Sequence, residues 1–346
     1  MVKYNFKDDY SEGCHPNILK KLSETNFDQQ DGYGDDEYSR EAKELIKKLI
    51  EKEKAEIYFV SGGTQANLVI ISSVLRSHES VISVSTGHIA SHEAGAIEAT
   101  GHKINSVDSP DGKLRVDDIC KVLKEHELVP HMVKPKLVYI SDSTEMGTIY
   151  KKEDLKELSD YCKNNDLYLF IDGARLGPAI SSIENDITLK DIAELTDIFY
   201  IGGTKNGALL GEAIVIINKK LKEDFAFHIK QRGGLMSKGR VAGIQFLELF
   251  KNDLFFQLAT HADKMAQKIK TGLEEAGYSF LTDSPTNLIL PVLPDKLIKE
   301  MQKIYGFHMW GNFDDNRSTI RLITSWATKE EAVEEFISDL LSFNIY

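Results

Sequence analysis

The chain has 346 residues, with 42 Lys or Arg and 54 Asp or Glu, which gives a formal net charge of −12. It contains no Lys/Arg-rich block and no long apolar run, so nucleic-acid and membrane partners are not expected. The N-terminal stretch lacks the apolar segment of a signal peptide, and we expect a cytoplasmic protein. Three separated cysteines, Cys14, Cys120 and Cys162, predict neither a disulfide framework nor a metal site.

Apolar runs alternate with helical patterns between about residues 40 and 240. This alternation is typical of a parallel sheet covered by crossover helices. One covering helix is expected over 152–164, where Leu155 and Leu158 recur among charged residues. Strands are expected at 57–60, 80–84, 136–140, 167–171, 198–201 and 213–217. The sequence therefore predicts an α/β domain with a mostly parallel central sheet.

The pattern changes after about residue 245, where one long helical stretch, 245–276, is followed by short strands at 287–290 and 319–323. This change predicts a small α+β C-terminal domain. The length of the chain also favours a large domain with a smaller one appended. The expected parts are an N-terminal arm over 1–14, a large domain over 15–245 and a small domain over 246–346.

The first segment with chemical character is Ser61-Gly62-Gly63-Thr64, which follows an expected strand and opens a helix. Glycines let backbone N–H groups approach an anion, and the helix N-terminus and the Thr64 hydroxyl add favourable dipoles. The segment matches neither the dinucleotide fingerprint nor the P-loop, which removes the usual support for a nicotinamide oxidoreductase. Taken alone, it fits a phosphate site or a tight structural turn.

Asp172 and Lys205 stand at the ends of two further apolar strands, where open α/β sheets place their ligands. Asp172 alone could cap the next helix. Lys205 lies between glycines with no charged neighbour for several residues, which suits an amine that loses its proton and forms a Schiff base. A carboxylate at the depth of Asp172 suits the ring nitrogen of pyridoxal 5'-phosphate (PLP), which it keeps protonated. The order phosphate loop, Asp172, Lys205 therefore predicts a PLP site.

With these motifs the chain resembles the fold-type I PLP enzymes of the β-eliminating lyase family, and among them the threonine aldolases. The resemblance extends from Tyr33-Gly34-Asp35-Asp36 to the stretch 320–325, nearly the whole length. It implies a fold-type I, transferase-like large domain with the small α+β domain appended. It also implies a homodimer or homotetramer whose active sites lie at the subunit interface.

The resemblance assigns roles to several residues. Lys205 would carry the cofactor, Asp172 would face its ring nitrogen, and Arg175 would lie near its ring oxygen or the substrate carboxylate. The phosphate would be held by Gly63, Thr64 and Thr204. Tyr33 and Lys230, with Arg232 as the second choice for Lys230, would reach the active site of the neighbouring subunit.

Two histidines and one arginine complete the implied site. His88 would stack on the cofactor ring, although a lone histidine after a strand is more often structural, as we expect for His92. His131 would lie near the substrate side chain, although it could equally be a surface residue beside Pro130. Arg321 lies in an apolar strand and needs an anion, which could be a structural Asp; the resemblance implies the substrate α-carboxylate instead.

One stretch around His131 also invites a different interpretation. The string 126–131 resembles a zinc-protease motif, but its spacing is one residue too long and Pro130 would break the required helix.

The sequence departs from many threonine aldolases at two places. It has Asp142-Ser143-Thr144-Glu145 where they have Glu-Asn-Thr-His, and Asp8-Asp9 where they have Ser-Asp. A carboxylate-binding serine is therefore absent or shifted to Ser11. These departures leave the cofactor chemistry unchanged and the exact substrate open.

The expected reaction is retro-aldol cleavage of a small β-hydroxy-α-amino acid, threonine or allo-threonine, to glycine and an aldehyde. The base would be His131 or His88, directly or through water. Other PLP reactions on the same scaffold, namely β-elimination, racemisation or transamination, remain alternatives because they share the cofactor residues. A non-catalytic PLP-fold binding protein is a more distant alternative.

Overall fold

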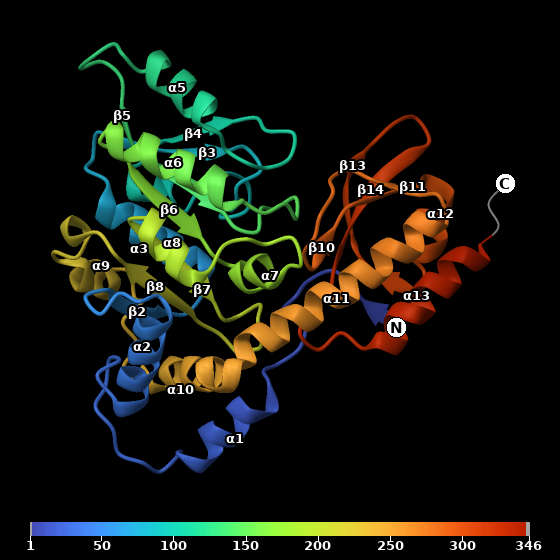
Figure 1. The fold of residues 1–346 in the computed structure, drawn as a ribbon, viewed down its shortest axis with the longest axis horizontal. Helices are drawn as coiled ribbons and strands as arrows, with labels where there is room; N and C mark the ends of the chain where they lie inside the picture. The colour runs from blue at the N-terminus through green and yellow to red at the C-terminus, as the bar shows by residue number, and fades with distance from the viewer. Residues whose placement is uncertain (1, 344–346) are drawn as a thin grey trace.

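The computed structural model describes residues 2–343 and contains a central seven-stranded sheet (Figure 1). The strand order is β2-β8-β7-β6-β5-β3-β4, and all strands are parallel except β8, which runs antiparallel to both neighbours. The strands are β2 (Glu56–Val60), β3 (Glu79–Val84), β4 (Ile104–Val107), β5 (Lys134–Ser141), β6 (Tyr168–Asp172), β7 (Ile198–Gly202) and β8 (Glu212–Ile216). The six expected strands are confirmed. The short edge strand β4 was not expected.

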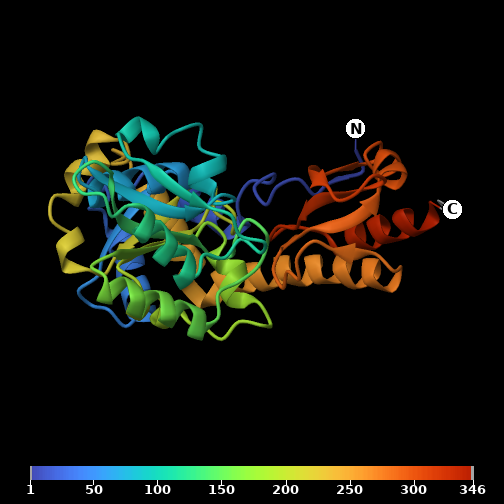
Figure 2. The same cartoon turned by 90° about the horizontal axis from the view of Figure 1, so that it is seen from above.

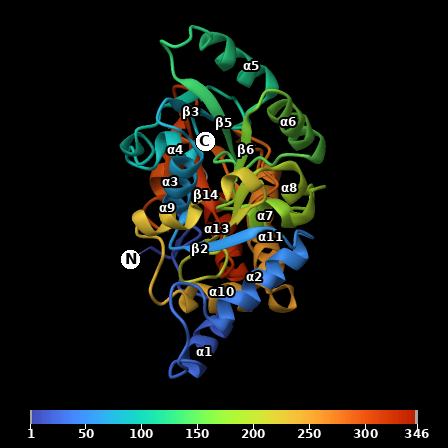
Figure 3. The ribbon, with the colours of Figure 1, turned by 90° about the vertical axis from the view of Figure 1, so that its left-hand side faces the viewer.

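Neighbouring residues of the strands point to two separate hydrophobic cores, because side chains alternate across a sheet. Phe170 belongs to one core and Ile171 to the other; Tyr200 and Ile201 divide in the same way. One face is covered by α3 (Gly63–Val74) and α9 (Phe225–Gln231). The other is covered by α1 (Pro16–Glu24), α2 (Glu37–Leu49), α5 (Val116–Glu125), α6 (Lys152–Asn164), α7 (Leu176–Ser181), α8 (Leu189–Leu195) and α10 (Arg240–Phe250). Figure 3 shows the two helical layers on either side of the sheet.

The C-terminal part forms a smaller sheet with its own helices, beside the part that contains the seven-stranded sheet (Figures 1 and 2). Its antiparallel sheet has the order β10-β14-β11-β9, with β13 also paired to β14. The elements are α11 (Leu254–Glu275), β9 (Ser279–Phe280), β10 (Leu288–Ile289), β11 (Pro291–Pro294), α12 (Asp295–Met301), β12 (Tyr305–Gly306), β13 (His308–Asn312), β14 (Arg317–Ile323) and α13 (Glu330–Ser342). The expected α+β character of this part is confirmed.

The N-terminal segment packs with the C-terminal part. Strand β1 (Tyr4–Asn5) pairs in parallel with β12, and Phe6 is fully buried in the core formed by α11, α12 and α13. The chain then returns to the large part through the loop that carries Asp8 and Asp9.

The helix expected over 245–276 is two helices. Helix α10 ends at Phe250 and α11 begins at Leu254. Between them Asn252 and Asp253 have φ of 56° and 57°, the left-handed conformation that Asn and Asp tolerate better than most residues. The boundary expected after residue 245 falls inside α10, and the division of the chain into domains stays a prediction. Within residues 2–343 no helix is both long and apolar enough to cross a membrane.

Candidate active site

A cavity of about 320 Å³ lies at the carboxyl ends of the parallel strands, beside the N-terminus of α3. Loops that follow β2, β3, β5, β6 and β7 line it, together with one side chain from β14. Seven residues that the sequence predicted for the site line this cavity: Gly63, Thr64, His88, Arg175, Thr204, Lys205 and Arg321. The fold thus brings together residues that lie far apart in the sequence.

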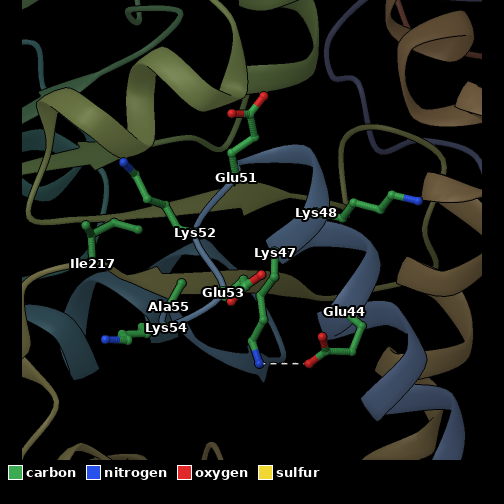
Figure 4. Close-up of a pocket in the computed structure, with 9 residues that line it drawn as sticks. All are labelled: Glu44, Lys47, Lys48, Glu51, Lys52, Glu53, Lys54, Ala55 and Ile217. Atoms are coloured by element: carbon green, nitrogen blue, oxygen red, sulfur yellow. Dashed lines mark hydrogen bonds and ion pairs between the residues drawn. The ribbon is translucent and has the colours of Figure 1, made fainter.

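A larger hollow of about 760 Å³ lies elsewhere, at the opposite edge of the sheet (Figure 4). It is lined by Lys and Glu side chains of α2 and the following loop, with Ala55 and Ile217 at its base. It contains none of the predicted site residues and no set of converging polar groups. We therefore assign the active site to the smaller cavity, where the functional side chains converge.

Gln65 holds the loop 61–64, the predicted phosphate loop, in place. Its Oε1 accepts hydrogen bonds from the Ser61 backbone N–H and hydroxyl, at 3.0 and 2.8 Å, and its Nε2 donates to the Arg232 carbonyl at 3.3 Å. Gly63 opens α3, and a Cβ on it would come within 3.1 Å of the Tyr200 Oη. At the preceding Gly62 a Cβ would meet no atom within 4 Å, so the start of the helix is open to the cavity and suits a phosphate.

Asp172 is buried and accepts four hydrogen bonds. Its donors are Tyr139 Oη at 2.5 Å, Asn67 Nδ2 at 3.0 Å, the Ala174 backbone N–H at 3.0 Å, and the Tyr200 hydroxyl. Burial, together with the Asp172 charge, raises the pKa of Tyr139 and of Tyr200 well above the usual value for tyrosine. Both hydroxyls therefore stay protonated and act as donors. This network fixes the carboxylate at the depth expected for a partner of the cofactor ring nitrogen.

His88 opens α4 (His88–Ser91) and is oriented by a buried carboxylate. Its Nδ1 lies 2.8 Å from Glu93 Oε1, and that oxygen also accepts a hydrogen bond from Asn67 Nδ2 at 2.7 Å. Burial lowers the pKa of His88, but the Glu93 hydrogen bond and nearby carboxylates outweigh it and raise the pKa. In this geometry His88 Nδ1 carries a proton and donates it to Glu93, and the ring lines the cavity.

Lys205 follows β7 in a turn that is tied to the neighbouring strand. The Gly203 backbone N–H donates to Glu212 Oε2 at 2.8 Å, and the Gly211 N–H donates to Thr204 Oγ1 at 3.0 Å. Arg175, Arg321 and His88 pair with carboxylates around the cavity, whereas no ion pair within residues 2–343 involves Lys205. Its amine is therefore available for a covalent bond to a ligand.

Glu212 is a buried carboxyl group in the wall of the cavity, and burial raises its pKa to about 7. A carboxyl group whose pKa is raised on folding contributes its full stabilisation below its unfolded pKa and loses it as the pH rises through the folded pKa. The wild type should therefore lose stability between about pH 5 and about pH 8.5, while Glu212→Gln should lose up to about 3 kcal/mol less. Denaturant unfolding of both proteins without cofactor at the two pH values tests this; equal losses would contradict it.

Arg175 is already paired inside the chain. Its Nε and Nη2 donate to the two oxygens of Asp9 at 2.8 and 3.2 Å, and its Nη1 lies 3.6 Å from Glu145 Oε2. Asn287 Nδ2 also donates to Asp9 at 3.1 Å. Burial would raise the pKa of Asp9, but the Arg175 and Lys205 charges and the hydrogen bonds from Arg175 and Asn287 together outweigh it, and the pKa is lowered. Arg175 can line the site without needing a ligand charge.

Arg321, in contrast, lacks a close partner. Its side chain is only 14% exposed, its Nε is buried without a hydrogen-bond partner among residues 2–343, and its nearest carboxylate is Asp8, 4.0 Å from Nη2. Burial lowers its pKa. A buried guanidinium with a free donor needs an anion, which makes Arg321 the candidate for binding a substrate carboxylate.

The structure does not bring His131 to this cavity. His131 is exposed and precedes the N-terminal end of β5, whereas the site lies at the carboxyl end of that strand, roughly 25 Å away for its eight residues. His131 therefore does not reach the cavity of its own chain, and its expected role near the substrate stays a prediction. Ser11 is exposed, lies 3.4 Å from Asn5 Nδ2, and does not line the cavity.

Tyr33 and Lys230 also lie outside the cavity, in contact with each other. Lys230 Nζ lies 4.5 Å from the centre of the Tyr33 ring, and both side chains are exposed. Their role at a neighbouring subunit stays a prediction. Arg232 directly follows the end of α9, the helix that carries Lys230. Its carbonyl accepts a hydrogen bond from Gln65, and its Nε is buried without a partner among the described residues.

Several residues of the site were not predicted from the sequence. They are Asn67, Glu93, Tyr139, Tyr200, Glu212, Glu145, Asp9 and Tyr10. Of these, Glu145 and Asp9 had a visible signal, because each lies in a stretch where the sequence departs from many threonine aldolases. His92, expected to be structural, lines the cavity with its ring 5.7 Å from that of His88.

Solved structures with low sequence identity share this fold. An aspartate aminotransferase of Thermus thermophilus is 15% identical, covers 96% of this chain and 90% of its own, and has a TM-score of 0.73. The fold is therefore that of the fold-type I enzymes, and the expected fold class is confirmed.

The chain belongs to the β-eliminating lyase family, whose model matches residues 8–295. A low-specificity L-threonine aldolase of a Pseudomonas species is 32% identical, with 96% of this chain and 95% of that protein aligned. The structure of a threonine aldolase from Leishmania major is 48% identical, covers 98% of this chain and 99% of its own, and has a TM-score of 0.96.

Proposed function

We propose that this protein is a PLP-dependent lyase that cleaves threonine or allo-threonine to glycine and acetaldehyde. The observation that carries the proposal is the meeting of Lys205 and Arg321 at one cavity. The Asp172 carboxylate is fixed behind its wall through the Tyr200 hydroxyl, and the Arg321 Nε is buried without a hydrogen-bond partner among the described residues. The names of the relatives in the same family support the substrate class.

The residues of the cavity fit PLP. Lys205 offers a free amine, the N-terminus of α3 with Thr64 and Thr204 offers a phosphate site, and Asp172 offers a buried acceptor for the ring nitrogen. His88 offers a ring held by Glu93 for stacking. When bound, PLP supplies an electron-withdrawing ring, conjugated to the substrate nitrogen, that accepts the electron pair released from Cα.

The side chains of this chain orient the substrate. Arg321 holds the α-carboxylate, and this restricts rotation about the bond between Cα and the nitrogen. Holding the scissile bond in one orientation converts binding energy into rate. Asp9 fixes Arg175 in the wall of the same cavity through two hydrogen bonds, so the guanidinium charge is held in place there.

Product analysis tests the proposal. Incubation with threonine and allo-threonine, serine and phenylserine in both α-configurations should release glycine and the matching aldehyde from at least one β-hydroxy amino acid. Release of 2-oxobutyrate and ammonia instead would assign β-elimination on the same scaffold. The proposal would be wrong if the protein neither gained visible absorbance on addition of PLP nor released an aldehyde.

We further propose a homodimer or homotetramer in which Tyr33 and Lys230 contact the partner's site. Both are exposed beside each other and outside the cavity of their own chain. Lys205→Ala and Lys230→Ala variants should each be weakly active, and mixing them under subunit exchange should restore about a quarter of the wild-type activity, because one hybrid site has all its residues. A mixture with no gain contradicts sharing of the site. The cytoplasmic location stays a prediction.

A further inference from the structure

Glu145 is held rigidly at the tip of a turn that follows β5. The Thr144 N–H donates to the Thr148 carbonyl at 2.9 Å, and the Thr144 hydroxyl accepts from the Thr148 N–H at 3.2 Å. Gly147 has φ of 79°, and Ser284 of the C-terminal part donates to its carbonyl at 2.9 Å. The turn is thus held between the two parts of the molecule. The Glu145 side chain lines the cavity.

Pairing with Arg175 does not account for Glu145. Asp9 already holds Arg175 through two hydrogen bonds, while Glu145 approaches Nη1 only to 3.6 Å. The Glu145 side chain is 8% exposed, and its carboxylate accepts no hydrogen bond within residues 2–343. Its oxygens are not among the fully buried atoms that lack a partner, so the carboxylate is open to the cavity and can meet a group that arrives with the substrate.

The other polar groups in the cavity have competing contacts. His88 Nδ1 is bonded to Glu93, and His92 Nδ1 lies 2.6 Å from Ser91 Oγ. Arg175 and Arg321 cannot accept a proton. The Glu212 carboxylate accepts the Gly203 N–H, beneath the Lys205 turn. Each imidazole keeps its Nε2 as a further acceptor, but Glu145 is the carboxylate that lies beside Arg175 in the cavity that Arg321 also lines. The substrate carboxylate and its neighbouring carbons would lie there.

We infer that Glu145 is the group that takes the proton from the β-hydroxyl of the substrate, an assignment that rests on the proposed cleavage reaction. The O–H bond breaks, its electron pair forms the aldehyde C=O bond, and the Cα–Cβ pair passes to Cα. One proton leaves the hydroxyl and one reaches Cα, so no oxidant or other co-reactant is required. Glu145 loses its proton again before the next turnover.

The test compares Glu145→Gln with Glu53→Gln, which makes the same charge change at an exposed residue of the distant hollow in Figure 4. In Glu145→Gln, kcat for aldehyde release should fall about 100-fold or more, with KM changed less than about threefold, because only proton transfer is removed. The cofactor absorbance, the Kd for PLP and the exchange of a glycine α-proton for deuterium should stay within about threefold of wild type. Glycine has no β-hydroxyl and does not need this base.

Equal loss of glycine exchange and aldehyde release in Glu145→Gln would assign a structural role and overturn the inference. So would full cleavage activity of this variant, or the selective loss appearing in His92→Asn instead. If the glutamine variant does not fold, Glu145→Asp, which retracts the carboxylate by one methylene, should still lower cleavage but not glycine exchange; equal loss of both there overturns it too. Absence of aldehyde release by the wild type would instead remove the proposed function, and the inference with it.

Discussion

Replacing Lys205 by alanine should lower aldehyde release by about 10⁴-fold or more and abolish the visible absorbance of the bound cofactor, because no other amine lies in the cavity wall. The turn around Lys205 is fixed by backbone contacts and by Glu212, so the variant should fold. Absorbance spectra after addition of PLP, together with coupled detection of acetaldehyde, measure both effects.

A matched control for this variant is Lys54→Ala, at an exposed lysine beside the distant hollow. It removes the same charge and should leave the spectrum and the rate unchanged. Lys205→Ala protein with more than about a tenth of the wild-type rate would show that the amine is not part of the chemistry, since removing a covalent catalyst costs several powers of ten.

Replacing Arg321 by glutamine should lower kcat/KM for threonine about 10³-fold, because truncating one partner of a buried charge pair costs roughly 2–5 kcal/mol. The loss should vanish for an amino alcohol that has no carboxylate, whose spectral binding constant should match in both proteins. The spectrum of the cofactor itself should not change, since Arg321 comes from the small sheet and not from the strands that surround Lys205.

Arg317→Gln is the matched control on the same strand. Arg317 is exposed and paired with Asp314 at 2.6 Å, at the far end of β14 from the cavity. Exposed pairs of this kind contribute little, so its kcat/KM should match that of the wild type. Similar losses in the two variants would indicate damage to the small sheet and not loss of a carboxylate contact.

The sequence predicted the strands and the residues that stand at their ends. Apolar runs such as 167–171 and 198–201 are continuous because both faces are buried, and chemistry-bearing residues at the strand ends, such as Asp172, could be identified by position alone. Local motifs therefore revealed the phosphate loop, Asp172 and Lys205.

Contacts between distant segments could not be predicted in this way. The Asp9–Arg175 pair joins residues 166 positions apart, and the tyrosines that donate to Asp172 are ordinary members of apolar strands until the register of the sheet is known. His131 was assigned by resemblance alone, and local sequence does not show that it lies at the other end of β5 from the cavity of its own chain. The break between α10 and α11 depends on two left-handed residues that carry no strong signal.

The pairing of β1 with β12 also bears on how the protein is made. Tyr4 and Tyr305 lie about three hundred residues apart, so this contact has a very high contact order and closes late in folding. The residues proposed to hold PLP all lie between Gly63 and Lys205, so they leave the ribosome before Arg321. The arm carrying Asp9 is synthesised first but gains its partner strand only near the end of synthesis. A partly made chain can thus complete the large sheet while it still lacks the means to hold an amino acid.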